Sequence, residues 1–308
     1  DGCSALLGAS AHIEWIADAG TTPFSPTDLA WHPKRMELYV TNSASNSLQV
    51  FDFSHGGQQP LSSRLWKDRA HYHYMASISS ISFDEIGQYA TCQESLNDYN
   101  KTMLPNFFMG PSLYSSDIPV DSRMLDCDEK FDATCFLIHI DMLHESPLCM
   151  GIAHDHAASS DVKIGNNFVS YKNVYWTFDG GHGQLVRYDF QADHGPGSMD
   201  HSLAEVRRYT GLKLSRQPDV PSHMIVDAPE RLLYVCDTGA NRILKVFVDT
   251  GHYVRSAREQ FPIFSSPDPK FNYTIWAGIE WRLLALVSSP SGLALSRAVL
   301  YVTSRADS

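Results

Sequence analysis

The 308-residue sequence lacks a long hydrophobic run. Its most apolar stretch, residues 279–287, contains Glu280 and Arg282, whereas a membrane-spanning helix needs about 20 consecutive apolar residues. Basic residues are also scarce, since 24 Lys and Arg stand against 35 Asp and Glu and the net charge is −11. Nucleic acid and anionic lipid bind to basic surfaces. We therefore expect a soluble protein without a membrane span or a nucleic-acid partner.

Familiar catalytic motifs are absent as well. The sequence contains no GxSxG, no P-loop and no GxGxxG before a helix. It has no CxxC spacing, which argues against a zinc cluster held by thiolates. The glycine-rich residues 180–183 indicate a β-turn between two strands. No complete catalytic set is visible, and we expect a protein that is not an enzyme.

The six cysteines are even in number. Cys127 and Cys135 bracket a short acidic loop, and we predict a disulfide between them. Cys92, Cys149 and Cys236 lie in apolar, strand-like runs, which predicts buried, unreactive thiols.

Several features favour secretion. The chain begins at Asp1, as a mature form does after removal of a signal peptide. Asn100 and Asn272 head the sequons Asn-Lys-Thr and Asn-Tyr-Thr and are predicted N-glycosylation sites. We expect an extracellular or cell-surface protein.

A repeat runs through the chain. Residues 26–52 align without a gap on residues 221–247: a proline-led strand, a Tyr-Val strand and a third strand after Asn. Further copies start near 78, 147 and 290. Each unit indicates short strands joined by Asn, Asp or Gly turns. Because one such sheet cannot bury both its faces, the units are expected to stack around an axis as a β-propeller of four-stranded blades.

These units resemble the NHL-repeat family, and residues 234–243 (YVCDTGANRI) match its second and third strands best. The resemblance implies a propeller and leaves the activity open. The stretch from residue 141 to 197 is similar to large secreted NHL-repeat proteins of bacteria and unicellular eukaryotes, whose role is mostly unassigned.

Five repeats are visible in a single domain spanning residues 1–308, with inserted loops at about 97–135 and 154–172. The last blade looks incomplete. Residues 12–17 are a candidate for the strand that completes it, and we expect either that the natural chain continues past residue 308 with more of a blade, the sixth, or that the sequence is a fragment. Long loops on a rigid scaffold are where binding sites tend to lie.

Histidine and aspartate gather in and beyond the middle third of the chain. Around the Gly-Pro-Gly turn at 195–197, the side chains of Asp193, His194, Asp200 and His201 are candidates for a cation site, or for caps on loop backbone. Calcium would suit the carboxylates, and zinc or another transition metal the imidazoles.

His144 and His223 stand beside prolines that start inner strands. This placement resembles the peptidyl-α-hydroxyglycine amidating lyases, NHL propellers with a central zinc held by such histidines. The resemblance stops at two ligands, because Pro26 and Pro290 have no matching histidine. It implies a metal-dependent lyase or hydrolase using His144, His223 and a third ligand such as His154; a satisfied inner-strand histidine is the alternative for His223.

The segment His71-Tyr72-His73-Tyr74 alternates at strand period. It indicates a blade strand with one solvent-exposed face, or aromatic rings that stack on a bound sugar.

We prefer a secreted, non-enzymatic propeller that presents its loops to a protein or glycan partner, or to copies of itself in an extracellular assembly. The metal-dependent lyase or hydrolase is the competing hypothesis.

Overall fold

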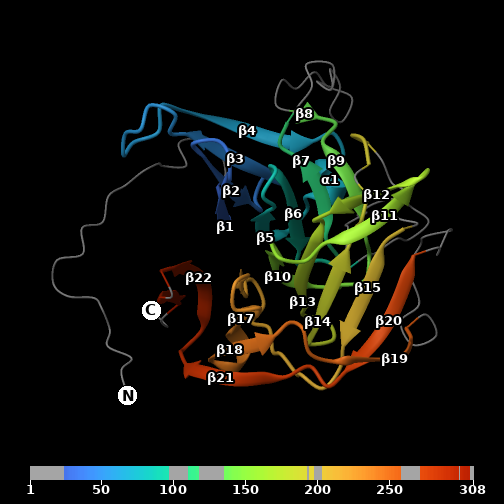
Figure 1. The fold of residues 1–308 in the computed structure, drawn as a ribbon. Coiled ribbons are helices and arrows are strands. Elements are labelled where there is room, and N and C mark those ends of the chain that lie inside the picture. Colours follow the sequence, from blue (N-terminus) through green and yellow to red (C-terminus); the bar gives the residue numbers. More distant parts are fainter. Residues whose placement is uncertain are drawn as a thin grey trace.

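The computed structural model describes residues 24–96, 110–117, 135–192, 194–197, 203–257, 271–297 and 299–305. In this part of the chain the regular elements are strands, apart from the short helix α1 (His71–Tyr74) and the 3-10 turn η2 (Thr238–Ala240). Four sheets of four to six strands and a two-stranded sheet follow one another around an axis (Figure 1). The protein is therefore all-β with a propeller-like ring of sheets, as its repeats predict.

Each sheet runs outward from the axis. The first contains β1 (Pro26–Trp31), β2 (Glu37–Asn42), β3 (Ser47–Asp52), β4 (Ser62–Asp68) and β8 (Cys135–Phe136). The second contains β5 (Ile78–Phe83), β6 (Gln88–Gln93), β7 (Ser112–Ser115) and β9 (His139–Met142). The third contains β10 (Cys149–His154), β13 (Val174–Asp179), β14 (Gln184–Asp189), β15 (Glu205–Tyr209), β20 (Asn272–Ala277) and β19 (His252–Ser256). The fourth contains β16 (Met224–Asp227), β17 (Leu232–Asp237), β18 (Arg242–Phe247) and β21 (Trp281–Leu286). The fifth is the hairpin β22 (Pro290–Ser296) and β23 (Val299–Ser304).

The predicted repeat starts coincide with the inner strands β1, β5, β10, β16 and β22, which begin at or within three residues of the expected positions. Neighbouring inner strands contact one another in chain order. The ring in the described residues thus consists of four larger sheets and one two-stranded sheet, fewer than the six blades expected of a longer chain.

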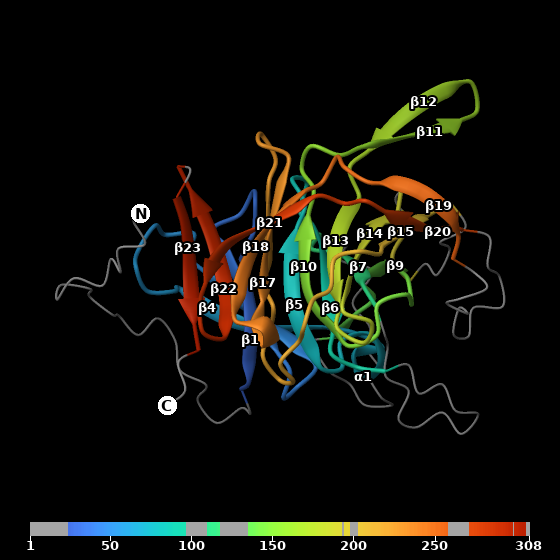
Figure 2. The same cartoon turned by 90° about the horizontal axis from the view of Figure 1, so that it is seen from below.

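The two predicted insertions contain strands. Residues 110–117, inside the expected loop 97–135, supply β7, the third strand of the second sheet. The expected loop 154–172 forms the hairpin β11 (Ser160–Ile164) and β12 (Asn167–Tyr171), which projects from the ring (Figure 2).

Hydrophobic side chains fill the space between sheets. In β13, Tyr175 faces the cluster shared with the second sheet, and Trp176 faces the cluster shared with the fourth. Since successive side chains of a strand point to opposite faces, a strand between two neighbouring sheets is buried on both. This is why β13 is apolar throughout most of its length and fully buried.

Hydroxyl groups tie the starts of the inner strands together. Thr27 Oγ1 donates to the Ile78 carbonyl at 2.7 Å, and Ser79 Oγ donates to the Cys149 carbonyl at 2.6 Å. A β-bulge at the start of β1 and another at the start of β5 bend the strands there. In this way the first three sheets are joined side by side at one end of the axis.

The third and fourth sheets approach too closely for a side chain at Gly151. A Cβ atom there would lie 2.0 Å from the Ser222 carbonyl oxygen, so only glycine fits. The Ser222 N–H donates to the Met150 carbonyl at 2.9 Å beside it.

Two local predictions are wrong. The segment 71–74 is the helix α1, not a strand; the Ala70 N–H bonds to the Asp68 carboxylate at 2.8 Å, and main-chain bonds close a helical turn after it. Cys92 and Cys149, expected as free thiols, form a disulfide between β6 and β10, with their Cα atoms 5.3 Å apart. Only Cys236 is a free buried cysteine among the described residues, as predicted.

The outer part of the third sheet comes from an insertion that the repeat pattern did not reveal. After β18, the chain returns to the third sheet, where β20 pairs parallel with β15 and antiparallel with β19. It then supplies β21 to the fourth sheet. No helix in the described part of the chain is both long and apolar enough to cross a membrane.

Candidate functional site at the axis

A polar pocket of about 250 Å³ lies where the inner strands begin. We call it the axial mouth, and it is lined by Ser25, Thr27, Ser43, Ser77, Ile78, Ser79, Glu94, Asp219 and Pro221. These residues precede or start inner strands of three sheets, or follow second strands. The repeat itself therefore gathers them, because equivalent positions of successive units meet at the axis.

Two acidic residues stand on one side of the axial mouth. The Glu94 carboxylate contacts Arg216 and accepts a hydrogen bond from the Asp219 N–H at 3.0 Å. Burial raises the pKa of Glu94, although the Arg216 charge opposes the shift. Asp219 adopts a left-handed backbone (φ 61°) and its side chain is exposed. The mouth thus presents one free acidic side chain beside several hydroxyl groups.

Asp28 and His223 lie next to the mouth, from opposite parts of the ring. His223 Nε2 is 3.6 Å from Asp28 Oδ1, and both side chains are largely buried. His223 Nδ1 accepts the Leu293 N–H at 3.1 Å, which places the proton of the neutral ring on Nε2, facing Asp28. Asp28 Oδ2 accepts the Ile81 N–H at 2.9 Å, and burial raises the pKa of this carboxyl. His223, predicted as a metal ligand or a satisfied histidine, has protein partners at both nitrogens.

Sequence reasoning missed Asp28 as the partner of His223. The signal was present: in the gapless alignment of residues 26–52 on 221–247, Asp28 and His223 occupy the same repeat position. Equivalent inner-strand positions converge on the axis in a propeller, so a carboxylate and an imidazole at one position are expected to meet.

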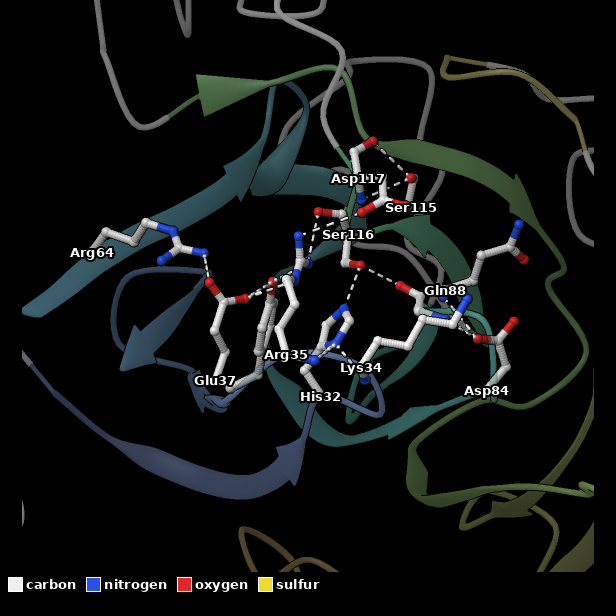
Figure 3. A network of polar contacts seen from close by, with 12 residues as sticks. His32, Lys34, Arg35, Glu37, Arg64, Asp84, Gln88, Ser115, Ser116 and Asp117 are labelled. Atoms are coloured by element: carbon white, nitrogen blue, oxygen red, sulfur yellow. Dashed lines mark hydrogen bonds and ion pairs between the residues drawn. The ribbon is translucent and has the colours of Figure 1, made fainter. Parts of the chain in front are cut away.

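His32 and Ser116 form a second pair, away from the mouth at the other end of β1 (Figure 3). His32 Nε2 and Ser116 Oγ are 2.9 Å apart, which resembles a nucleophile and its base. However, His32 Nδ1 accepts the Lys34 and Arg35 N–H groups, so Nε2 carries the proton and donates to the hydroxyl. Ser116 Oγ in turn donates to the Gly87 carbonyl.

Burial lowers the pKa of His32 to about 4, with the Arg35 charge adding to the effect. A neutral ring that already donates from Nε2 cannot take the serine proton. The pair therefore connects the first two sheets, and an ion pair between Arg64 and Glu37 at 2.7 Å continues the network.

His154 has partners at both ring nitrogens. Nε2 donates to the Lys172 carbonyl at 2.5 Å, and Nδ1 lies 3.0 Å from His156 Nδ1. Burial lowers the pKa of His154 to about 4. The ring is neutral and packs on Tyr175 at a centroid distance of 4.9 Å.

The other predicted metal ligands divide into two groups. His194 Nδ1 lies 3.1 Å from Asp141 Oδ2, and His144 is half-buried in the link between β9 and β10. Asp193, Asp200 and His201 lie outside the described residues. Within the described ranges, no three His, Cys, Asp or Glu side chains are grouped so as to hold a metal ion. The calcium or zinc site at residues 193–201 stays a prediction.

The predicted modifications are placed as follows. Asn272 starts β20 and is exposed, whereas Asn100 lies outside the described residues. Cys135 is in β8, and its predicted partner Cys127 lies outside the described residues.

One carboxyl is buried away from both networks. Glu145, just before β10, is 6% exposed and lies beside Arg208. Burial raises its pKa to about 8, although the Arg208 charge opposes the shift. Arg208 donates to Asp179 Oδ2 at 2.5 Å and to the Tyr273 hydroxyl at 2.8 Å. Arg208 is thus paired with Asp179, and burial favours the protonated form of Glu145 by raising its pKa.

The fold defines the class of protein, a β-propeller-like protein, and comparisons add no family. No family model and no curated protein matches the chain. Solved structures with similar folds include an auxiliary nutrient binding protein from Bacteroides ovatus, at 12% identity and a TM-score of 0.40, covering 82% of this chain and 42% of that one. A functionally unknown protein from Desulfotomaculum acetoxidans is 13% identical with a TM-score of 0.43, and the match covers 91% of this chain and 63% of that one. Virginiamycin B lyase from Staphylococcus aureus is 10% identical with a TM-score of 0.35, and the match covers 94% of this chain and 87% of that one.

The chain spans less than two thirds of the length of the first two of these structures. With TM-scores below 0.5, the similarities carry no argument about activity.

Proposed function

We propose that this protein is a secreted, non-enzymatic propeller with NHL-type repeats that binds a protein or glycan partner at the cell surface or in an extracellular assembly. The observation that carries the proposal is the axial mouth. Among the described residues, its lining offers hydroxyl groups and carboxyl groups but no imidazole or thiol. Such a lining suits recognition of a polar group more than covalent catalysis.

The contacts of two histidines support a binding role. His32 donates from Nε2 to Ser116 Oγ and accepts main-chain N–H groups at Nδ1. His223 Nδ1 accepts the Leu293 N–H, and its Nε2 lies 3.6 Å from Asp28 Oδ1. A general base needs a free lone pair within reach of its substrate. The disulfide Cys92–Cys149 and the exposed sequon at Asn272 support a secretory route.

Charge favours a partner with a basic or neutral polar group at the mouth. The chain carries a net charge of −11, and Asp219 is exposed beside the serines. An anionic partner would be repelled.

The test is an array of basic peptides and neutral glycans probed with the purified chain. We expect saturable binding to one class, reduced about tenfold or more by Asp219→Ala, which corresponds to about 1.4 kcal/mol. Asp161→Ala, at an exposed carboxylate of β11, is the matched control and should leave binding unchanged.

Elemental analysis gives the opposing outcome. Stoichiometric zinc or copper that is lost from the double variant His144→Ala/His223→Ala, together with a loss of catalytic activity, would contradict the non-enzymatic proposal and favour the metal-dependent lyase or hydrolase.

A further inference from the structure

A second polar groove, of about 430 Å³, lies far along the third sheet on its outer strands β15, β20 and β19. It is lined by two residues of β15, three of β20 and two of β19, and it shares no residue with the axial mouth. We call it the lateral groove. The third sheet has two more strands than the fourth, so these outer strands extend beyond its neighbour.

Strand register explains why these side chains share a face. Glu205 pairs with Asn272 and Arg207 with Thr274 across β15 and β20, and alternate residues of a strand point the same way. On β19, Tyr253 and Ser256 both line the groove although they are three positions apart. A β-bulge between residues 253 and 255 shifts the alternation by one and brings Ser256 to the same face as Tyr253.

Two aromatic side chains, Tyr253 and Trp276, line the lateral groove. The Tyr253 side chain is 57% exposed and lies across the ladder from Trp276. Trp276 is held in place: its indole N–H donates to Thr274 Oγ1 at 3.0 Å, and the Arg207 guanidinium lies 4.6 Å above its ring centroid. Tyr253 therefore offers an exposed ring face next to the fixed indole ring of Trp276.

The charged side chains that line the lateral groove, Glu205 and Arg207, have a net charge of zero. Arg207 Nη2 pairs with Glu205 Oε2 at 3.0 Å, so the two charges cancel. The amide of Asn272 and the hydroxyl of Ser256 are exposed and supply both donors and acceptors. A neutral ligand that combines many hydroxyl groups with an apolar C–H face matches this combination, whereas an anionic ligand would meet the Glu205 carboxylate and the negative net charge.

We propose that the lateral groove is a carbohydrate-binding site for a neutral oligosaccharide, with a pyranose ring stacked on Tyr253 and its hydroxyls hydrogen-bonded to Glu205, Arg207 and Asn272. The site is separate from the axial mouth, so its binding does not depend on that proposed function. Asn272 is itself the head of a sequon. The same carbohydrate chemistry thus has two sources, a partner's glycan or the glycan attached to Asn272.

The test uses unglycosylated, nitrogen-15-labelled protein from an oxidising bacterial compartment, titrated with the β-1,4-linked trimer of N-acetylglucosamine. The readout is the indole N–H signal of Trp276 in NMR spectra, identified by its disappearance in Trp276→Phe. We expect a saturable shift of this signal. Tyr253→Ala should weaken binding about tenfold, as loss of a stacking ring does.

Tyr301→Ala is the matched control, because Tyr301 is a similarly exposed tyrosine (54%) on the edge strand β23. It should bind the trimer as the unmodified chain does. A Trp276 signal that does not respond to millimolar trimer, or equal weakening by both tyrosine variants, overturns the proposal.

A second arm separates the two sources. Protein from a eukaryotic secretory host is compared with the unglycosylated bacterial protein, which has the same sequence. If the attached glycan fills the groove, the Trp276 signal of the glycosylated protein is already shifted and the trimer binds only to the unglycosylated protein. If both forms bind the trimer, the groove is open to a partner's glycan. Because Asp219 is not altered, the binding assay at the axial mouth is unaffected by either result.

Discussion

His223 Nε2 faces Asp28 Oδ1 across 3.6 Å, although 195 residues separate them in the chain and they belong to the fourth and first sheets. Both stand at the third position of a proline-led unit. The Asp28 carboxylate also accepts the N–H groups of Leu29 and Ile81. One side chain therefore connects three inner strands near the axis.

Removal of this carboxylate should destabilise the ring. Asp28→Ala leaves the Ile81 N–H without its acceptor, and a buried unsatisfied donor costs about 1–3 kcal/mol. Urea denaturation is the measurement. Asp28→Asn keeps an acceptor oxygen and should recover most of the loss; equal stability of Asp28→Ala and the unmodified chain would contradict this role.

Glu145 should make stability fall between acidic and mildly alkaline pH. Its pKa is raised from 4.5 to about 8 by burial. The folded state therefore holds a proton that the unfolded state releases above pH 4.5. The stabilisation from this carboxyl is complete below pH 4.5. Between pH 4.5 and about 8 the free energy of unfolding falls by about 1.4 kcal/mol per pH unit, and the stabilisation is lost once the pH has risen through 8.

The experiment compares the unmodified chain with Glu145→Gln, which keeps the shape without the titration. The stability of the variant relative to the unmodified chain should rise steadily from pH 5 to pH 8. Glu230→Gln, at an exposed carboxyl, is the control. A stability difference between Glu145→Gln and the unmodified chain that is constant over this range would rule out the titration of Glu145.

Ser116 should be unreactive toward serine-hydrolase probes. It is 1% exposed and donates its proton to the Gly87 carbonyl, while His32 is already a donor. We expect no labelling by a fluorophosphonate, measured by mass spectrometry of the peptide that contains it. Ser116→Ala should lower the free energy of unfolding by about 1–3 kcal/mol, since it removes the acceptor of His32. Covalent labelling of Ser116 would contradict the assignment.

The disulfide Cys92–Cys149 should contribute substantially to stability. It links positions 57 residues apart, and the loss of chain entropy in the unfolded state for such a loop is worth about 4 kcal/mol. The double variant Cys92→Ser/Cys149→Ser should unfold at lower denaturant. Cys236→Ser, at a free buried cysteine of another hydrophobic cluster, controls for the loss of a buried sulfur. No difference between the two in denaturation midpoint would refute the estimate.

Local pattern predicted much of the fold. The proline-led and Tyr-Val strands at 26–52 and 221–247 appear as β1–β3 and β16–β18, because turn residues and strand propensities act over a few positions. The same logic failed at His71–Tyr74, where alternation over four residues does not distinguish a strand from a helical turn.

The pairs that the sequence did not predict are the distant ones. Cys92 and Cys149 come from two different sheets, and nothing local to either residue indicates which partner the ring will bring. The lateral groove depends on β20, whose parallel pairing with β15 follows from the return path of the chain rather than from its own residues. The Asp28–His223 contact could have been predicted, since both residues occupy the same position of the repeat and such positions converge on the axis.

The path of the chain from the fourth sheet through the third and back has a consequence for unfolding. The chain leaves the fourth sheet after β18, contributes β19 and β20 to the third, and returns to finish the fourth with β21. Neither of these two units is made from one continuous stretch of chain. They are therefore expected to open and close together as a single cooperative block, so that hydrogen exchange in β15 and β18 should proceed with one common free energy of opening.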